Sequence, residues 1–406
     1  MLKIALTQLD SGRHDPAVFA RDRAEFLTGL SREFTLIASR SGEEVEADLR
    51  VVFIASGGSE DAFRRHFPRL PKPLILLADG KHNSLAAALE ISAWVRRQGE
   101  SAEIVHGDSA SIASRLRRLA DFHRTRRALA GPIGMIGEPS DWLIASMLDH
   151  GAVRQRWGTE FLNISLSEVT APPLDDSEAA AIANEFNAGA AALDGVDHAA
   201  LLNAARLFPA LKAIFARHRL RAATVRCFSL IEPLRSSACL ALSRLNDMGL
   251  ISGCEGDAPA VFSMLLLFVL TGEIPFMANP ASVDIENNRL LLAHCSVPRR
   301  AVSGYRLQTH FETGIGVGVS GDFVPGPATV FKAGNAGLDS YFVSGAQVLP
   351  SPPAPGLCRT QVWLQLQEPA GYFLHSPLAN HHILIHGDHA ALVDEFMLHC
   401  GATRSR

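Results

Sequence analysis

Several signatures of common protein classes are missing from this sequence of 406 residues. Its longest largely apolar stretch is Val261–Leu270, far shorter than the roughly 20 residues that a membrane-spanning helix needs. The residues after Met1 are typical of a first strand and not of a signal peptide. We therefore expect a cytoplasmic protein that does not bind a membrane.

Charge and cysteine usage exclude further classes. The 38 basic and 42 acidic side chains give a formal net charge of -4, so the overall balance gives no reason to expect nucleic acid as a partner. None of the six cysteines forms a CxxC pair, so a four-cysteine zinc site lacks the spacing it would need. Without an export signal, free thiols are expected.

Two common families of catalytic motif are absent as well. The glycine-containing segment 55–60 follows a predicted strand, but it lacks the dinucleotide-binding fingerprint and the lysine of a phosphate-binding loop. The chain has no GxSxG segment of the kind that carries a nucleophilic serine. Hydrophobic residues make up 47% of the chain, which is ordinary for a globular protein.

Short apolar strands alternate with helical periods over the first 300 residues, which predicts parallel sheets covered by helices. The pattern restarts after Gly131 and includes a predicted helix over Trp142–Trp157. Beyond residue 300, Gly, Pro, Thr and Val increase, which favours a β-rich barrel or sandwich. We expect an α/β fold with two Rossmann-like domains, 1–130 and 131–300, and a C-terminal β-rich domain, 301–406. Ala-Pro-Pro at 171–173 is expected to break the strand before it, and 351–356 is expected to be a long proline-rich loop.

Polar residues follow three consecutive predicted strands. Glu255 lies in a strand-to-helix turn, and Asp257 is suited to cap the helix that follows. Asn279 and His294 come at the ends of the next two predicted strands. Ligands of open α/β sheets bind at the carboxyl ends of the strands, so we expect these polar residues to share one site. The alternative is that each is an ordinary cap, turn or structural residue.

A histidine-rich segment near the C-terminus is a fourth candidate. If it is a strand, His381 and His382 face opposite sides, so only one of them can enter a given site, and His386 shares the face of His382. Imidazole beside carboxylates suits a divalent metal such as Mn²⁺ or Zn²⁺. A histidine-rich surface turn is the alternative.

Several segments resemble, in matching order, the L-fucose/L-arabinose isomerase superfamily. The segments are Asn83–Glu90, Cys227–Phe228, Cys239–Asn246, Gly253–Asp257, Phe276–Asn279, Ala293–Cys295 and Asn380–His382. They span most of the chain, and the Glu-Gly-Asp and His-His segments are the more specific ones. The chain is shorter than the typical sugar isomerases, so it resembles a compact branch of the superfamily.

This resemblance implies two Rossmann-like domains, a barrel-like C-terminal domain and a homo-oligomer, often a trimer or hexamer. It also implies a metal-dependent aldose–ketose isomerase for a small sugar. In such enzymes a divalent cation, usually Mn²⁺, binds two sugar oxygens and stabilises an ene-diolate while a proton moves between C1 and C2. By position, Glu255 matches the metal-binding catalytic carboxylate, and Asn279 falls at the second carboxylate. His294 and His381, or failing that His382, match histidine ligands.

Asn279 departs from the pattern of the superfamily. An amide oxygen can bind a metal but cannot take up a proton at neutral pH. Either another acid replaces it or the reaction is not ordinary isomerisation. The candidate acids are Asp257, Asp284, Glu286 and Glu312. We hypothesise that Asn279 marks altered chemistry, such as an epimerase or a lyase. A non-catalytic sugar-binding protein is the alternative from another class.

Overall fold

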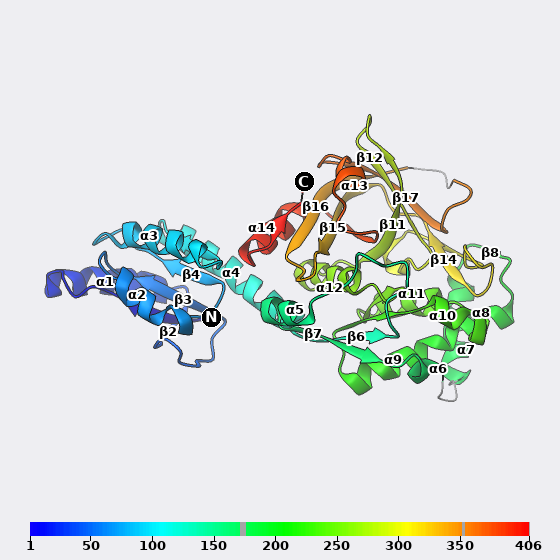
Figure 1. Ribbon diagram of the computed structural model, residues 1–406, viewed down its shortest axis with the longest axis horizontal. Helices are drawn as coiled ribbons and strands as arrows, with labels where there is room; N and C mark the ends of the chain where they lie inside the picture. Colours follow the sequence, from blue (N-terminus) through cyan, green and yellow to red (C-terminus); the bar gives the residue numbers. More distant parts are fainter. Residues whose placement is uncertain (171–175, 351–353, 406) are drawn as a thin grey trace. The chain divides into compact units, whose positions relative to one another are not determined.

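The computed structural model describes residues 1–170, 176–350 and 354–405 (Figure 1). The strand-breaking segment 171–173 lies outside these residues, as does the first part of the predicted proline-rich loop at 351–356. The chain divides into two compact units. One consists of Met1–Arg127 with Phe396–Gly401, and the other of Ala128–Glu395 with Ala402–Arg406.

The first unit is built on a parallel sheet with the strand order β2-β1-β3-β4-β5. Its strands are β1 (Lys3–Leu9), β2 (Thr35–Ala38), β3 (Leu49–Ile54), β4 (Leu74–Leu77) and β5 (Ala102–Val105). The helices that connect them are α1 (Pro16–Ser31), α2 (Glu60–His66), α3 (Ser84–Arg97) and α4 (Ser109–Leu129). Strands β3 and β4 are almost entirely buried, as expected for the centre of a parallel sheet.

The second unit contains another parallel sheet, with the order β10-β9-β6-β7. Its strands are β6 (Gly131–Ile136), β7 (Thr159–Ile164), β9 (Ala222–Val225) and β10 (Ile251–Cys254). The helices along this part of the chain are α5 (His150–Trp157), α6 (Ser167–Thr170), α7 (Asp176–Gly189), α8 (His198–Ala205), α9 (Leu207–His218), α10 (Phe228–Leu234), α11 (Cys239–Asp247) and α12 (Ala258–Thr271).

A closed antiparallel barrel completes this unit, with the order β15-β18-β11-β12-β17-β16 and a β15–β16 pairing that closes it. Its strands are β11 (Phe276–Asp284), β12 (Arg289–His294), β15 (Gly326–Gly334), β16 (Ser340–Leu349), β17 (Thr360–Leu366) and β18 (His382–His386). A small separate sheet contains β8 (Leu193–Asp194), β13 (Tyr305–Gln308) and β14 (Gly318–Gly321). The remaining elements are α13 (Tyr372–His375), α14 (Ala390–His399) and β19 (Thr403–Arg404).

The parallel sheets with flanking helices and the C-terminal barrel confirm the predicted fold class. One assignment within it was wrong. Strands β11 and β12, which carry Asn279 and His294, are antiparallel neighbours in the barrel and not part of the parallel sheet. A strand pattern in the sequence shows which residues alternate, but not which strand is its partner.

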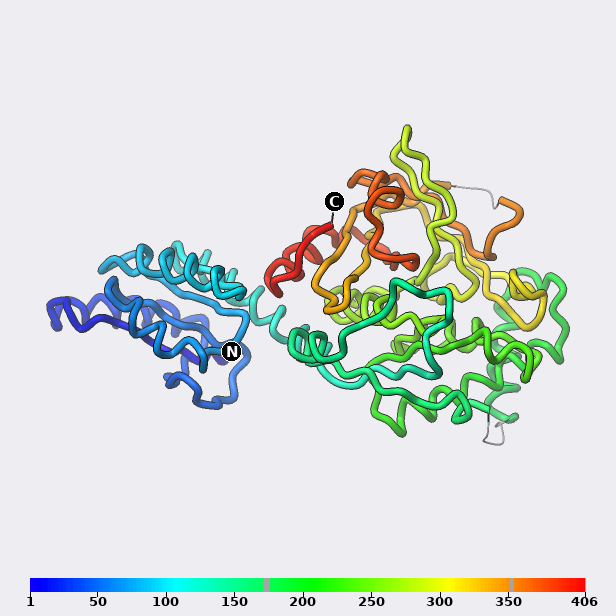
Figure 2. Tube along the Cα trace, viewed as in Figure 1, coloured from blue at the N-terminus to red at the C-terminus, as the bar shows by residue number. Residues whose placement is uncertain are grey.

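The predicted helix over Trp142–Trp157 was also wrong in its first half. Helix α5 begins at His150, and the Asp149 side chain caps it by accepting a hydrogen bond from the backbone N–H of Ala152. Residues 138–149 form a loop, which can be followed in Figure 2 between β6 and α5. Trp142 therefore lies in this loop.

The apolar helix α12 joins the parallel sheet to the barrel. Its residues from Ala258 to Leu267 are all buried, and it packs against β10 on one side and β15 and β18 on the other. As predicted, Asp257 caps the helix, with its Oδ1 accepting a hydrogen bond from the backbone N–H of Ala260 at 2.9 Å. This packing brings the turn at the end of β10 to the barrel.

A second apolar stretch, His198–His218, passes a length and composition test for a membrane-crossing helix. Half of its most apolar window is buried, and Arg206 separates it into α8 and α9. A core helix of a folded protein passes the same test, so this stretch is weak evidence for a membrane span.

We predict that Trp157 is a main anchor of the second unit. Its indole is 2% exposed, packs against Phe262 of α12 at 5.2 Å between ring centroids, and donates a hydrogen bond to the carbonyl of Leu338. Trp157→Ala should lower the free energy of unfolding by about 3–5 kcal/mol, because it leaves a large cavity. Trp157→Phe keeps most of the packing and should cost clearly less. Equal urea midpoints for wild type and Trp157→Ala would contradict this.

Candidate functional site

Glu255 occupies an unusual backbone conformation directly after β10. Its φ is +64°, and Gly256 follows with a φ of +74°. A Cβ on Gly256 would lie 2.7 Å from Cα of Pro139, so no other residue fits there. The backbone N–H of Ser140 donates to the Glu255 carbonyl at 2.9 Å. A non-glycine residue held in a left-handed turn is the kind of strain found at functional sites.

The carboxylate of Glu255 is largely buried and is held by a tryptophan. Nε1 of Trp142 donates to Oε2 at 2.6 Å, and the Trp142 ring packs edge-on against Phe228. The other oxygen, Oε1, lies 3.5 Å from Nε2 of His381. The sequence reasoning missed Trp142, because a tryptophan in a loop carries no positional signal.

His381 is oriented by Asp257. Its Nδ1 donates to Oδ2 of Asp257 at 2.9 Å, and neither residue is exposed. This bond holds a proton on Nδ1, so Nε2 is the ring nitrogen that can lose its proton and bind a metal. Nε2 is buried and has no hydrogen-bond partner among the residues that the structure describes. A histidine bound to a carboxylate in this way is typical of metal ligands.

His294 completes a compact group with Glu255 and His381. Its ring is 5% exposed, and Nδ1 shares a hydrogen bond with the Ser296 hydroxyl at 2.9 Å. The His294 and His381 rings meet edge to face at 5.7 Å. One ring nitrogen of His294, a Glu255 oxygen and the Cys254 sulfur all lie within 4.8 Å of one another. These atoms are close enough to share one metal ion.

Asn279 lies beside this group without touching it. Its register partner on the neighbouring strand β12 is Ala293, next to His294, and its Oδ1 accepts a hydrogen bond from Nδ2 of Asn380 at 2.8 Å. Among the described residues, it makes no hydrogen bond to Glu255, His294 or His381. Asn279 thus borders the site through Asn380, the residue before His381.

The other histidines of the C-terminal segment have different partners. His382 interacts with the Tyr372 hydroxyl through Nε2 at 3.1 Å and with the Asn380 carbonyl through Nδ1 at 2.8 Å. His386 bonds to the carbonyl of Ala301. Of the two adjacent histidines, only His381 contacts Glu255 and Asp257.

The buried charges set the protonation states of this site. Burial favours a raised pKa for Glu255, but its interactions with His381 and Trp142 lower that pKa to about 2. Burial favours a lowered pKa for His381, but Asp257 and Glu255 raise it to about 9. Burial and the nearby His381 lower the pKa of His294 to about 3. At neutral pH, Glu255 is therefore ionised and His294 is neutral.

The sequence pattern also did not lead us to predict a buried lysine beside Asp257. Lys332 of β15 is fully buried, and its Nζ lies 3.8 Å from Oδ2 of Asp257. Burial opposes ionisation of Asp257, yet the charge of Lys332 and the bond from His381 keep its pKa well below the ordinary range. The available signal was a lysine inside the apolar strand sequence of residues 328–333.

The acids considered as replacements for Asn279 are differently placed. Asp257 is already bonded to His381 and to the start of α12. Asp284 and Glu286 lie at the turn between β11 and β12, where Asp284 accepts hydrogen bonds from Asn287. Glu312 contacts His310 and Cys358. Among the described residues, none of the last three forms a hydrogen bond or ion pair with Glu255, so no free second carboxylate joins the described site.

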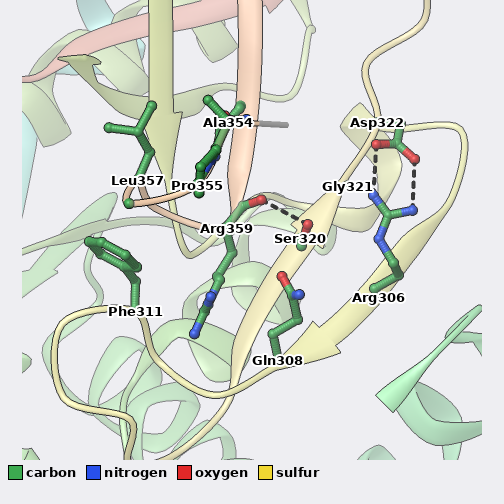
Figure 3. A pocket seen from close by; sticks show the side chains of 12 residues that line it. Arg306, Gln308, Phe311, Ser320, Gly321, Asp322, Ala354, Pro355, Leu357 and Arg359 are labelled. Atoms are coloured by element: carbon green, nitrogen blue, oxygen red, sulfur yellow. Dashed lines mark hydrogen bonds and ion pairs between the residues drawn. The ribbon is translucent and has the colours of Figure 1, made fainter. Parts of the chain in front are cut away.

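A separate cavity of about 320 Å³ opens beside β13, β14 and β17 (Figure 3). On one side Arg306 pairs with Asp322 through two hydrogen bonds. On the other side Arg359 lies 5.6 Å from the Phe311 ring centroid and donates to the carbonyl of Thr309. The cavity is lined by neither Glu255 nor the site histidines.

Comparison with known proteins finds sulfoquinovose isomerases, whereas no family model matches the chain. The sulfoquinovose isomerase of Alkalicoccus urumqiensis is 26% identical over 263 residues, which are 62% of this chain and 59% of that protein. The enzyme of Priestia megaterium is 24% identical over 181 residues, covering 42% and 40%. That of Clostridium sp. is 29% identical over 135 residues, covering 32% and 30%.

The chain therefore matches about three fifths of the length of the Alkalicoccus relative and less of the others. These similarities relate it to sugar isomerases, which agrees with the resemblance noted in the sequence.

We predict that His381 of the metal-free protein titrates near pH 9. Because the folded pKa lies above the ordinary value of about 6.5, this histidine stabilises the fold fully below pH 6.5, and the stabilisation is lost as the pH rises through 9. Asp257→Asn should bring the pKa down and destabilise the fold by about 3–5 kcal/mol, because it breaks a buried pair.

The test is imidazole NMR and urea unfolding of chelator-treated protein. Asp284→Asn, at an exposed turn, is the control and should change neither quantity. An unaltered His381 pKa in Asp257→Asn would show that Asp257 does not hold the proton.

Proposed function

We propose that the chain is a metal-assisted aldose–ketose isomerase that acts on a sulfonated hexose. The observation that carries the reaction type is a buried cluster. In it Glu255 and His294 are close enough to share an ion, and Nε2 of His381, 3.5 Å from the Glu255 carboxylate, has no hydrogen-bond partner among the described residues. The similarity to sulfoquinovose isomerases supports the substrate class.

The residues present fit a divalent cation. One ionised carboxylate and two imidazole nitrogens form a ligand set that suits Mn²⁺ or Zn²⁺, and we propose Mn²⁺. His381 must lose its ring proton to bind, and Asp257 keeps the remaining proton on Nδ1. When bound, the cation would polarise O1 and O2 of an open-chain sugar and acidify the proton on the adjacent carbon.

The chain supplies the proton transfer and the orientation. Glu255 is ionised at neutral pH, so in our proposal it accepts the proton from C2 of the aldose and returns it to C1, while the proton of the C2 hydroxyl passes to O1. Trp142 fixes one oxygen of that carboxylate through its indole N–H, so the other oxygen is left for the reaction. Asp257, Lys332 and the start of α12 hold His381 in place.

Asn279 favours a second candidate function. It cannot act as a proton carrier, and the described site contains no free second carboxylate. A site with one carboxylate supports an epimerase or a lyase, because both can pass through the same ene-diolate.

We further propose a homo-oligomer, a trimer or hexamer, located in the cytoplasm. We also propose that the chain has three domains, 1–130, 131–300 and 301–406. Strands β11 and β12, within residues 276–294, are strands of the barrel. The second and third proposed domains are therefore joined by a shared sheet.

We expect Glu255→Gln to lower kcat for sulfoquinovose isomerisation by about 10²–10⁴-fold, the usual contribution of an acid–base group. The measurement is formation of the ketose product in the presence of Mn²⁺ and after chelation, with glucose as the unsulfonated comparison. Glu286→Gln at the β11–β12 turn is the matched control and should keep wild-type activity. No metal binding by the wild type, with sugar affinity unaltered by Glu255→Gln, would support a non-catalytic sugar-binding protein instead.

Asn279→Asp separates isomerisation from altered chemistry. If Asn279 sets a different reaction, the wild type should epimerise or cleave the sugar, and Asn279→Asp should gain isomerase activity by about 10² or more through its added acid–base group. NMR of the sugar products distinguishes these reactions. Full isomerase activity in the wild type, unimproved by Asp, would exclude the altered-chemistry hypothesis.

A further inference from the structure

A second group of metal-ligating side chains lies outside the proposed isomerase site. Ligand atoms of Cys295, His310 and Glu312 all lie within 4.8 Å of one another. Cys358 lies beside them, because its Sγ is 3.4 Å from Oε1 of Glu312. We propose that Cys295, His310, Glu312 and Cys358 bind a zinc ion.

The spacing of the ligand atoms agrees with a tetrahedral site. Zinc lies about 2.0–2.1 Å from nitrogen or oxygen and about 2.3 Å from sulfur, so the edges of its tetrahedron measure about 3.3–3.8 Å. Nε2 of His310 is 3.1 Å from Oε2 of Glu312, and the Cys358 sulfur is 3.4 Å from Oε1. The ligand atoms of Cys295, His310 and Glu312 lie within 4.8 Å of one another, so these three side chains would draw closer around an ion.

The surroundings of two ligands point to the same chemistry. Cys295 is 2% exposed and His310 is 5% exposed, so both side chains are shielded from water. Nδ1 of His310 bonds to the Thr313 hydroxyl at 3.1 Å, so Nε2 remains the nitrogen that faces Glu312. Outer partners of this kind orient the ligands of metal sites.

The ligand set separates this site from that of Glu255. Two sulfurs, one imidazole and one carboxylate favour Zn²⁺ over the harder Mn²⁺. The ligands come from the end of β12, the loop between β13 and β14, and the segment before β17. An ion there would tie two irregular loops to the barrel, and the His310 ring packs against Phe228, the neighbour of Trp142.

The test measures metal in the full-length protein, purified under reducing conditions without chelators, incubated with excess Zn²⁺ and desalted. Measured in the Glu255→Gln background, so that the Glu255 site does not contribute, we expect about one tightly held zinc per chain. Cys358→Ser and Cys295→Ser should each lose most of it, while Cys400→Ser, a cysteine in the first unit, should keep it. Glu255→Gln should also keep it, so the zinc site can hold even if the proposed isomerase function fails.

Replacement of zinc by Co²⁺ gives a second readout that does not depend on a variant folding. The wild type should show thiolate-to-cobalt charge-transfer bands and the strong visible bands of tetrahedral Co²⁺, and Cys358→Ser should lose the sulfur band. Three results would overturn the proposal. They are a wild type that retains no zinc, a Cys358→Ser protein that keeps full zinc content, and a Cys295–Cys358 disulfide that survives reduction and excludes the metal.

Discussion

The buried carboxylate of Asp257 is the interaction on which the second unit and its site depend. It caps α12 through Ala260, accepts the Nδ1 proton of His381 and lies near the ammonium group of Lys332. An ionised carboxylate away from water costs several kcal/mol unless such partners compensate it. The first turn of α12, the start of β18 and the strand β15 must therefore meet at this one point.

The position of Glu255 follows from that meeting point. Only Gly256 separates Glu255 from Asp257, and both residues of the turn have positive φ angles, so the chain reverses sharply between β10 and α12. Because Asp257 is bonded to Nδ1 of His381, this turn places the Glu255 carboxylate near Nε2 of the same imidazole. One histidine thus contacts Asp257 through one nitrogen and Glu255, the proposed catalytic carboxylate, through the other.

The sequence predicted the local features of this arrangement better than the long-range ones. The strand before Glu255, the Asp257 cap and the apolar helix α12 depend on neighbours within a few residues, and all three were predicted. The barrel position of Asn279 depends on pairing with β18, which is about 100 residues away, and periodicity carries no information about it. Lys332 can be recognised in the sequence as a lysine within an apolar strand, whereas nothing in the sequence indicates the position of Trp142.

Spacing rules missed the cysteine–histidine group for a similar reason. Short-range zinc motifs place pairs of ligands a few residues apart, but here only His310 and Glu312 are close in sequence. The two cysteines are brought together because β12 and β17 are paired neighbours, with His294 opposite Thr360. In a zinc finger, a short sequence motif brings the ligands together. Here the pairing of two strands does so, and this pairing cannot be recognised from the sequence.

Charge balance offers a reason why a site of this kind could have an asparagine at position 279. With both imidazoles neutral, Glu255 and Asp257 carry two negative charges and Lys332 carries one positive charge near the proposed cation. A divalent cation therefore leaves the site with one excess positive charge. A second carboxylate at position 279 would cancel that charge for a neutral sugar. A sulfonated sugar brings its own negative charge, so under the proposed function an uncharged Asn279 leaves the loaded site close to neutral, which favours binding in a low-dielectric interior.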